Sequence, residues 1–195
     1  MYIEQTKIKF SKEYQFNKTG TFHVTFKLYT KINMDYMFKD ISSLISISMA
    51  SNNDTHIISM KSTFENCENL NTIKIDGFNT DELLYMNKFL YKTSPSTLYL
   101  NGFSTKNVVD MSFMFSNIDN FYINLSQFDT SNVRDMSYMF YKSSVISLDF
   151  SSLNTSNVVD MAHMFDSCDA LDINLLNFDT RKVINMSGMF QDCIT

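Results

Sequence analysis

The chain has 195 residues, of which 44 % are apolar, and a formal net charge of −5. This apolar content is enough to bury a sizeable core, and the absence of any Lys/Arg-rich run argues against a nucleic-acid-binding surface. No apolar stretch approaches the roughly 18 to 20 residues that a membrane-spanning helix needs. Because the chain has only one proline and four glycines, we expect most turns to be formed by Asn, Asp, Ser and Thr, whose side chains hydrogen-bond to the nearby backbone.

Two short alternating runs mark the first 33 residues. Ile8 and Phe10 form one run, and in residues 22–28 Phe, Val, Phe and Leu alternate with other side chains. Such alternation predicts strands, and the two runs together predict a β-hairpin. We expect residues 1–33 to form a cap that covers the open strand edge and the terminal core of the rest of the chain. Charges interrupt every apolar run here, so the segment does not predict a secretory signal peptide.

A Met-led phrase recurs from residue 34 onward. Its copies begin at Met34, Met60, Met86, Met111, Met136, Met161 and Met186. Subtracting neighbours gives steps of 26, 26, 25, 25, 25 and 25 residues, so residues 34–195 hold about six and a half repeats. A fixed period of this length is typical of a solenoid, in which each repeat packs on the next. The chain ends inside the seventh repeat, which predicts a truncated array or one whose partner covers its end.

Each repeat contains three apolar blocks. In the Met phrase, apolar residues stand at i, i+3 and i+4, as in 136–140, which predicts one helical turn. A second block alternates, as in 73–75, and predicts a short strand with one buried face. A third block, such as 108–109, predicts a second strand. The predicted fold is an α/β repeat solenoid with short parallel strands and one helical turn per repeat, capped at its start by the β-hairpin.

Residues 128–141 and 153–165 resemble the 25 to 26-residue repeat of the BspA-like leucine-rich-repeat surface proteins. The resemblance extends over about residues 31–195. It implies a leucine-rich-repeat-like solenoid without enzymatic activity, displayed on a cell surface and engaged in adhesion or in recognition of host or matrix proteins. The chain differs from surface members of that family in showing neither a signal peptide nor an anchor, so its localisation stays open.

The three cysteines occupy one column of the repeat. Cys67, Cys168 and Cys193 each stand seven residues after the first Met of their repeat. Cys67 lies four repeats from Cys168, too far for a disulfide, whereas Cys168 and Cys193 are neighbours at about the strand spacing. Because other repeats place Thr93, Ile118 or Ser143 here, we expect a column of small buried residues and hence buried free thiols, with a bridge between Cys168 and Cys193 as the alternative.

An acidic column directly precedes the Met phrase. Asp110, Asp135 and Asp160 would stack about 5 Å apart, and their repulsion must be offset by hydrogen bonds to backbone amides or by a bound cation. Asn185 takes this place in the seventh repeat and caps equally well. Capping of the predicted helical turn is therefore the preferred interpretation, and a calcium site in the column is the alternative.

The sequence predicts neither catalysis nor a cofactor. His23, His56 and His163 share no repeat column, so they do not predict a metal site. No Ser-His-Asp spacing, Gly-rich phosphate loop or Cys-x-x-Cys pair is present. We therefore expect a protein that is not an enzyme and that works without a cofactor or metal.

The exposed positions of the predicted strands vary between repeats while their buried neighbours stay apolar. The positions that we predict to bind a partner are Lys74, Tyr99, Asn101, Tyr122, Asn124, Asp149 and Asn174. Variation on a constant scaffold favours a protein-recognition or adhesion module that binds another protein along this face. A merely solvated sheet is the simpler interpretation. The competing function is a structural spacer or assembly segment, which would associate end to end through its open C-terminal repeat.

Overall fold

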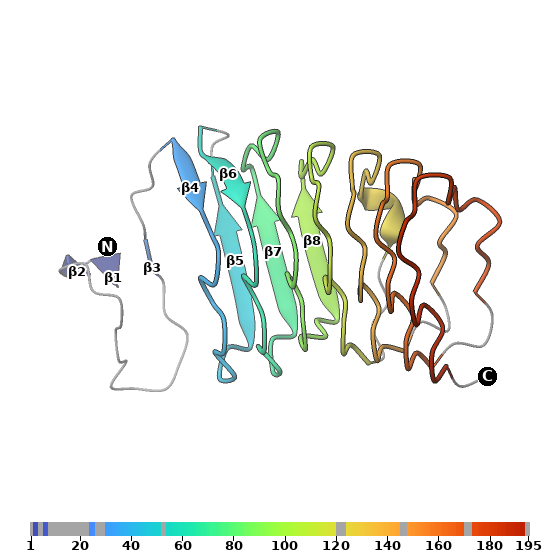
Figure 1. The fold of residues 1–195 in the computed structure, drawn as a ribbon. Coiled ribbons are helices and arrows are strands. Elements are labelled where there is room, and N and C mark those ends of the chain that lie inside the picture. Colours follow the sequence, from blue (N-terminus) through green and yellow to red (C-terminus); the bar gives the residue numbers. More distant parts are fainter. Residues whose placement is uncertain are drawn as a thin grey trace.

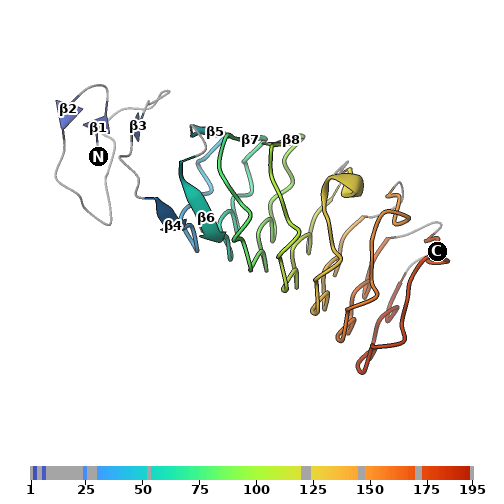
Figure 2. The ribbon, with the colours of Figure 1, turned by 90° about the horizontal axis from the view of Figure 1, so that it is seen from above.

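The computed structural model describes residues 2–3, 6–7, 24–25, 30–51, 54–119, 124–144, 148–169 and 173–193. Within these ranges the chain is built from short strands and tight turns. Successive repeats lie side by side from β4 to the C-terminal end, as Figures 1 and 2 show from two directions.

Three short strands lie near the N-terminus: β1 (Tyr2–Ile3), β2 (Thr6–Lys7) and β3 (Val24–Thr25). They form an antiparallel sheet in the order β2-β1-β3. The described residues here thus form a three-stranded sheet, and the predicted pairing of the two alternating runs stays a prediction. The predicted strand over 22–28 coincides with β3, whereas Ile8 and Phe10 lie outside the described residues.

Two parallel sheets begin the repeat array. The first pairs β4 (Lys31–Asn33) with β6 (His56–Ser59). The second has the order β5-β7-β8, formed by β5 (Ser46–Ala50), β7 (Thr72–Asp76) and β8 (Thr97–Asn101). Each strand of the second sheet comes from one repeat and pairs in register with the next, as the alternating pattern predicts.

The predicted α/β, leucine-rich-repeat-like solenoid is wrong, because the Met phrase is not a helical turn. Its third and seventh residues adopt left-handed backbone angles in every repeat, for example Phe113 at φ 56° and Asn117 at φ 57°. Two left-handed residues in such a short segment are incompatible with a right-handed helix. Among the described residues the only helix is the 3-10 helix η1 (Leu125–Gln127).

Hydrogen bonding explains why this backbone is chosen. Within the Met phrase, alternate amides turn out of the repeat and bond to the next one, as when Phe113 N donates to Ser137 O at 3.0 Å. The intervening amides close tight turns inside the repeat, as when Met114 N donates to Met111 O at 3.2 Å. A left-handed third residue suits such a turn. The phrase therefore satisfies half of its amides by pairing with the next repeat, where a helix would satisfy them within the segment.

The burial predicted for the Met phrase is confirmed. In the second to sixth repeats its first, fourth and fifth residues line the core, and Met136, Met139 and Phe140 are each at most 1 % exposed, whereas Met37, Met186 and Phe190 in the first and seventh repeats are exposed. The fifth-position rings stack along the array, with centroids 5.6 Å apart between Phe140 and Phe165. Two tight turns and one helical turn can bury the same positions. The periodicity therefore predicted the buried residues correctly, although the backbone conformation predicted from it was wrong.

The predicted strands are confirmed in two repeats, as β7 and β8, but the described residues of the next three repeats contain none of them. β5, in the first repeat, is a strand that the sequence did not predict. In the three repeats without these strands, Asn124, Asp149 and Asn174 hold one column, and each side-chain oxygen accepts the amide two residues later, at 3.0, 2.9 and 3.1 Å. These local bonds form turns that compete with strand pairing. The third apolar block forms a strand only before Met34 and Met60, as β4 and β6, and in the later repeats it gives single bridges, such as that between Asp110 and Asp135.

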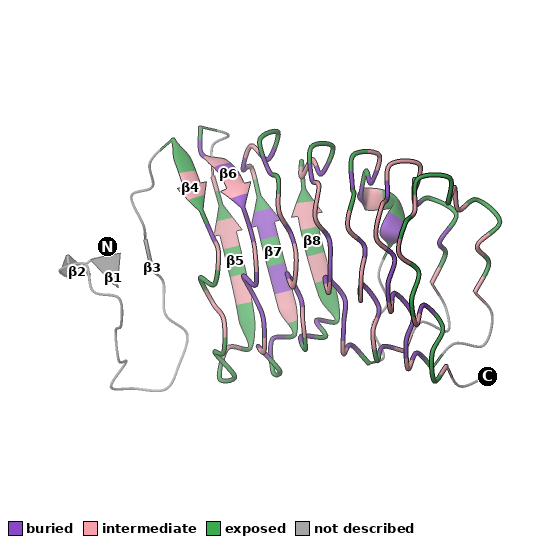
Figure 3. Ribbon diagram, viewed as in Figure 1, coloured by how far each residue is buried: buried purple, intermediate pink, exposed green. Residues whose placement is uncertain are grey.

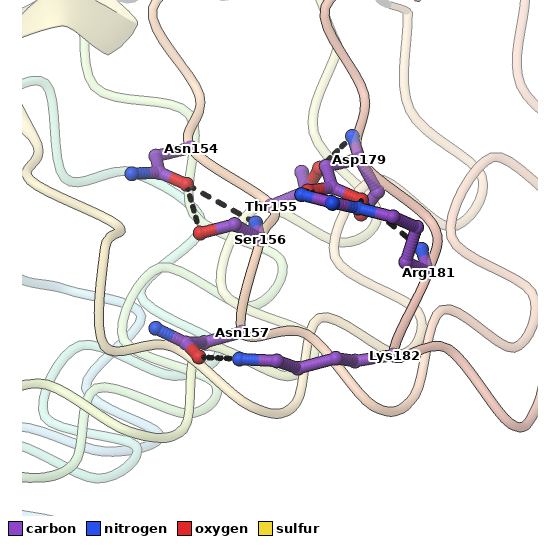
Figure 4. Close-up of polar contacts among 7 residues, drawn as sticks. All are labelled: Asn154, Thr155, Ser156, Asn157, Asp179, Arg181 and Lys182. Carbon is purple, nitrogen blue, oxygen red and sulfur yellow. Dashed lines mark hydrogen bonds and ion pairs between the residues drawn. The ribbon is translucent and has the colours of Figure 1, made fainter.

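The corner before each Met phrase is held by a threonine column. The Thr130 hydroxyl donates to Asn154 O at 3.0 Å and accepts from Asn154 N at 2.8 Å. Thr155 repeats both bonds with Asp179. Polar side chains complete the corner at the surface, where Lys182 Nζ donates to Asn157 Oδ1 and Arg181 pairs with Asp179 (Figure 4). This corner fixes the register of neighbouring repeats.

Replacing Thr130 by Val is expected to lower the free energy of unfolding by about 1 to 3 kcal/mol, because the amide of Asn154 loses its acceptor in a part-buried place beside the buried Thr130 side chain. Thr130→Ser keeps the hydroxyl and should lose much less. Urea unfolding followed by circular dichroism measures both. Equal losses in the two variants would contradict the role assigned to the hydroxyl.

Candidate functional site

A polar grid covers the outer face of the β5-β7-β8 sheet. In β7, Ile73 and Ile75 point inward and are fully buried, so the residues between and beside them face outward (Figure 3). The strand register places outward residues in three rows across the sheet. We call these rows the strand grid, and they are Ser46–Thr72–Thr97, Ser48–Lys74–Tyr99 and Ala50–Asp76–Asn101.

The strand grid offers several kinds of contact in a small area. Tyr99 is 48 % exposed and is the largest side chain on the grid. Lys74 lies opposite it in register, and Asn101 Nδ2 donates to Asp76 Oδ1 at 2.8 Å. The outward residues of β5 are only Ser and Ala. Their side chains are short, so this side of the grid projects less from the sheet than the β7 and β8 side. The surface thus combines one phenol, one cation, one carboxylate and one amide without strong net charge.

The structure brings together only part of the predicted binding residues. Lys74, Tyr99 and Asn101 lie on the strand grid. Asn124, Asp149 and Asn174 do not extend it, because their side chains hold local turns. The Ser151 hydroxyl and amide also keep the pKa of Asp149 below its usual range. Tyr122 lies outside the described residues.

The acidic column caps turns. Asp110 Oδ1 accepts a hydrogen bond from Ser112 N at 2.9 Å, and Asp135 Oδ1 accepts one from Ser137 N at 2.8 Å. Asp160 Oδ1 accepts the equivalent bond from Ala162 N. The capped element is the Met-phrase turn, not the predicted helical turn. Among the described residues there is no group of three or more His, Cys, Asp or Glu that could hold a metal ion, so the calcium alternative gains no support there.

Asp135→Asn is expected to raise the free energy of unfolding at neutral pH. Burial raises the pKa of Asp135, and the charges of Asp110 and Asp160 raise it further. A carboxyl whose pKa is higher in the folded state than in the unfolded state disfavours the fold above its folded pKa and not below its unfolded pKa. Asn keeps the acceptor without the charge, as Asn185 does for Ser187 at 3.2 Å.

The gain should be below about 1 kcal/mol at pH 7 and should disappear near pH 3. Denaturant unfolding at the two pH values measures it. The matched control is Asp129→Asn, because hydrogen bonds from Ser131 lower the pKa of Asp129, so losing this charge should lower stability at pH 7. If Asp135→Asn were as destabilising as Asp129→Asn, the repulsion inferred for the column would be contradicted.

The cysteine column is a hydrogen-bonding column. Cys67, Cys168 and Cys193 are free, and each thiol donates to the carbonyl of the fifth Met-phrase residue in the preceding repeat, at 2.9, 2.8 and 2.9 Å. Thr93 and Ser143 donate to the equivalent carbonyls through their hydroxyls. The sequence predicted this column to be buried and apolar, as it is at Ile118. The Cys, Thr and Ser residues in the other repeats, all of which can donate a hydrogen bond, were the available signal for the bond.

The native thiols are expected to react with a maleimide in a fixed order. Burial raises the pKa of Cys168 to about 12 and raises that of Cys67 and Cys193 as well, but only Cys193 is partly exposed. Cys193 should therefore label first, and Cys67 and Cys168 only after unfolding. Mass spectrometry of the peptides gives the order, and Cys193→Ser should abolish labelling of the native protein. Rapid labelling of Cys168 would contradict its burial.

The third residues of three successive Met phrases form an aromatic column that we did not predict. Phe113 stacks on Tyr138 at 4.4 Å, and Tyr138 stacks on His163 at 4.7 Å between centroids. Lys88 Nζ lies 5.2 Å from the Phe113 ring centre. The rings cover one another's faces, so the column presents mainly ring edges to solvent. Aromatic residues 25 apart in the sequence were the available signal.

His163 ends that column beside a buried carboxylate. Its Nδ1 lies 2.7 Å from Asp166 Oδ2, and the Ser167 hydroxyl donates to Asp166 Oδ1 at 2.7 Å. The serine hydroxyl is therefore directed at the acid and not at the imidazole. A serine nucleophile needs its hydroxyl on the base, so these residues are not arranged for nucleophilic catalysis.

An open groove of about 350 Å³ lies beside the seventh Met-phrase positions. Its lining residues are Glu68, Lys92, Ser94, Asn117, Asp119 and Lys142. Acids, lysines and amides alternate along it, so it offers no concentrated charge to a single ionic ligand.

Comparisons with known proteins identify a family but no characterised relative. A family model described as "Mycoplasma protein of unknown function, DUF285" matches residues 32–144 and again residues 89–195. The two matches overlap, as expected for a chain that contains repeats. No curated protein and no solved structure matches the chain. In the part of the chain that the structure describes, no helix is long and apolar enough to cross a membrane.

Proposed function

The chain belongs to the DUF285 family of Mycoplasma proteins of unknown function, and from the surface that its repeats present we propose that it is a non-catalytic protein-recognition module. The strand grid is the binding surface in this proposal. The observation that carries it is the contrast between the two faces of one sheet. Inward positions are apolar in all three strands, whereas outward positions change in size, charge and hydrogen-bonding capacity from strand to strand.

The chemistry of the strand grid suits a polypeptide partner. Tyr99 can insert a large, rigid, amphipathic side chain into a partner, which is how aromatic residues act at interface hot spots. Lys74, Asp76 and Asn101 lie around it as hydrogen-bonding groups. The low β5 side leaves room for partner side chains beside the phenol. A rigid sheet holds these groups in place, so little conformational entropy is lost on binding.

The proposal includes the absence of catalysis. It is supported by the roles of the polar residues in the array, which cap turns, stack or bond to neighbouring repeats. The hydroxyl of Ser167, which is linked to a histidine through Asp166, is used in this way. The resemblance to BspA-like surface proteins supports a partner outside the cell, such as a host or matrix protein.

Binding to immobilised fibronectin, laminin, collagen and fibrinogen, measured by biolayer interferometry, tests this function. We expect saturable binding to at least one of them. Lys74→Ala with Tyr99→Ala should weaken that binding by roughly tenfold or more, as expected for the loss of a hot spot. Both side chains are exposed, so the variant should unfold at the same temperature as the parent.

The matched control is Lys106→Ala with Tyr141→Ala, which removes the same two residue types from other faces of the array. It should leave binding unchanged. Binding that the strand-grid variant does not weaken would contradict the placement of the surface. No binding to any of the matrix proteins would contradict the proposed class of partner and favour a sheet that is merely solvated.

A further inference from the structure

The sequence contains one Asn-Gly pair, Asn101-Gly102, and it lies at the end of β8. Asn101 is the last residue of the strand, and Gly102 begins the turn that follows. Gly102 has a φ of 69°, a left-handed conformation that glycine adopts without steric cost. The turn thus favours glycine directly after Asn101, and no side chain at residue 102 stands between the Gly102 nitrogen and the Asn101 side chain.

Both residues are exposed, and the atoms that would react are not held by hydrogen bonds in the described part of the chain. Gly102 N donates no hydrogen bond there, and Asn101 Oδ1 accepts none. In the next repeat Ser126 and Gln127 belong to η1, and no described strand pairs with β8 on that side. The Gly102 amide is therefore accessible both to water and to the side chain of Asn101.

The same turn one repeat earlier is packed. Gly77 also has a φ of 69°, and it follows Asp76, which is the register partner of Asn101. A Cβ added to Gly77 would lie 2.1 Å from Ser51 O, whereas a Cβ added to Gly102 would meet no other part of the chain within 4 Å. Gly77 thus lies against the preceding repeat, whereas the turn at Gly102 has free space beside it.

We propose that Asn101 is a modification site, at which the side-chain amide converts to a carboxylate without an enzyme. The Gly102 nitrogen loses its proton to hydroxide and attacks Cγ of Asn101. The new N–Cγ bond closes a succinimide ring, the Cγ–Nδ2 bond breaks, and Nδ2 takes a proton from water and leaves as ammonia. Water then opens the ring at either carbonyl, which gives aspartate or isoaspartate. One ammonia is lost and one water is gained, and nothing is oxidised or reduced.

The conversion changes a hydrogen bond of the strand grid. Asn101 Nδ2 donates to Asp76 Oδ1 at 2.8 Å, and an ionised aspartate has no proton to donate there. Two carboxylates would then stand opposite each other in register, which destabilises a sheet. Isoaspartate also lengthens the main chain of β8 by one methylene. Any effect on partner binding rests on the proposed function, whereas the conversion itself does not.

Peptide mapping by mass spectrometry during incubation of the native protein in alkaline buffer tests the proposal. The peptide that contains Asn101 should lose the mass of ammonia and gain that of water. The conversion should become faster as the pH rises, because more of the Gly102 nitrogen is deprotonated. Isoaspartate should be among the products, because only the succinimide can open to it, whereas direct hydrolysis of the amide gives aspartate alone. Labelling by an isoaspartate-specific methyltransferase detects it.

The chain supplies matched controls for this reaction. Asparagines at the corner of the array are each followed by a valine whose amide donates to a threonine carbonyl, and they should stay unchanged over the same period. These control residues are Asn107, Asn132 and Asn157. Gly102→Ala should slow the conversion of Asn101, since a methyl group hinders the attack and the free space there admits it.

Comparison with the urea-unfolded protein tests whether the fold leaves this site accessible. Conversion in the native protein should be no more than about tenfold slower than in urea, a small difference in activation barrier. An Asn101 that stays unchanged in the native protein, converts no faster than the corner asparagines, or yields aspartate alone would overturn the proposal.

Discussion

The array depends on how the Met phrase directs its amides. Left-handed residues at the third and seventh positions turn every second N–H group along the stack, where it pairs with the next repeat. Except for Gly188, the residues at these positions have a side chain, and the left-handed conformation costs each of them about 1 to 2 kcal/mol. The pairing between repeats and the burial of Met and Phe beneath it must offset that cost. Isolated repeats should consequently be unstable, because the phrase is satisfied only by its neighbours.

The sequence predicted where the core lies better than it predicted the backbone. Spacing of i, i+3 and i+4 identified the buried residues, but a helical turn and two successive tight turns place the same positions inward. Nothing in residues such as Lys92 or Tyr138 signals a left-handed conformation, since glycine and asparagine are the usual markers. The deciding interaction is the bond to a residue about 25 positions away, which local propensity does not contain.

The candidate site was predicted in part for the same reason. Alternation located Lys74, Tyr99 and Asn101 correctly on an outward strand face. The corresponding pattern around Asn124 and Asp149 also looks like a strand, yet their side chains capture nearby amides and form turns. Asx residues inside an alternating run were the warning. The ordered grid is therefore shorter than the array, and a partner that spans more repeats would meet strands and turns in succession.

The one-way hydrogen bonding of the Met phrases has an electrostatic consequence for the molecule as a whole. Peptide dipoles that point the same way add along a stack, as they do along an α-helix. In a helix the amino end is positive, whereas here the phrase amides point toward the following repeat, so the positive direction of the stack runs toward higher residue numbers. Amides that donate to the preceding repeat, such as Ile184 N to Val159 O, Thr97 N to Asn71 O and Ser144 N to Ile118 O, oppose this in part. Within the described repeats, the stack of Met phrases is therefore polar along its axis, in a chain whose formal charge is −5.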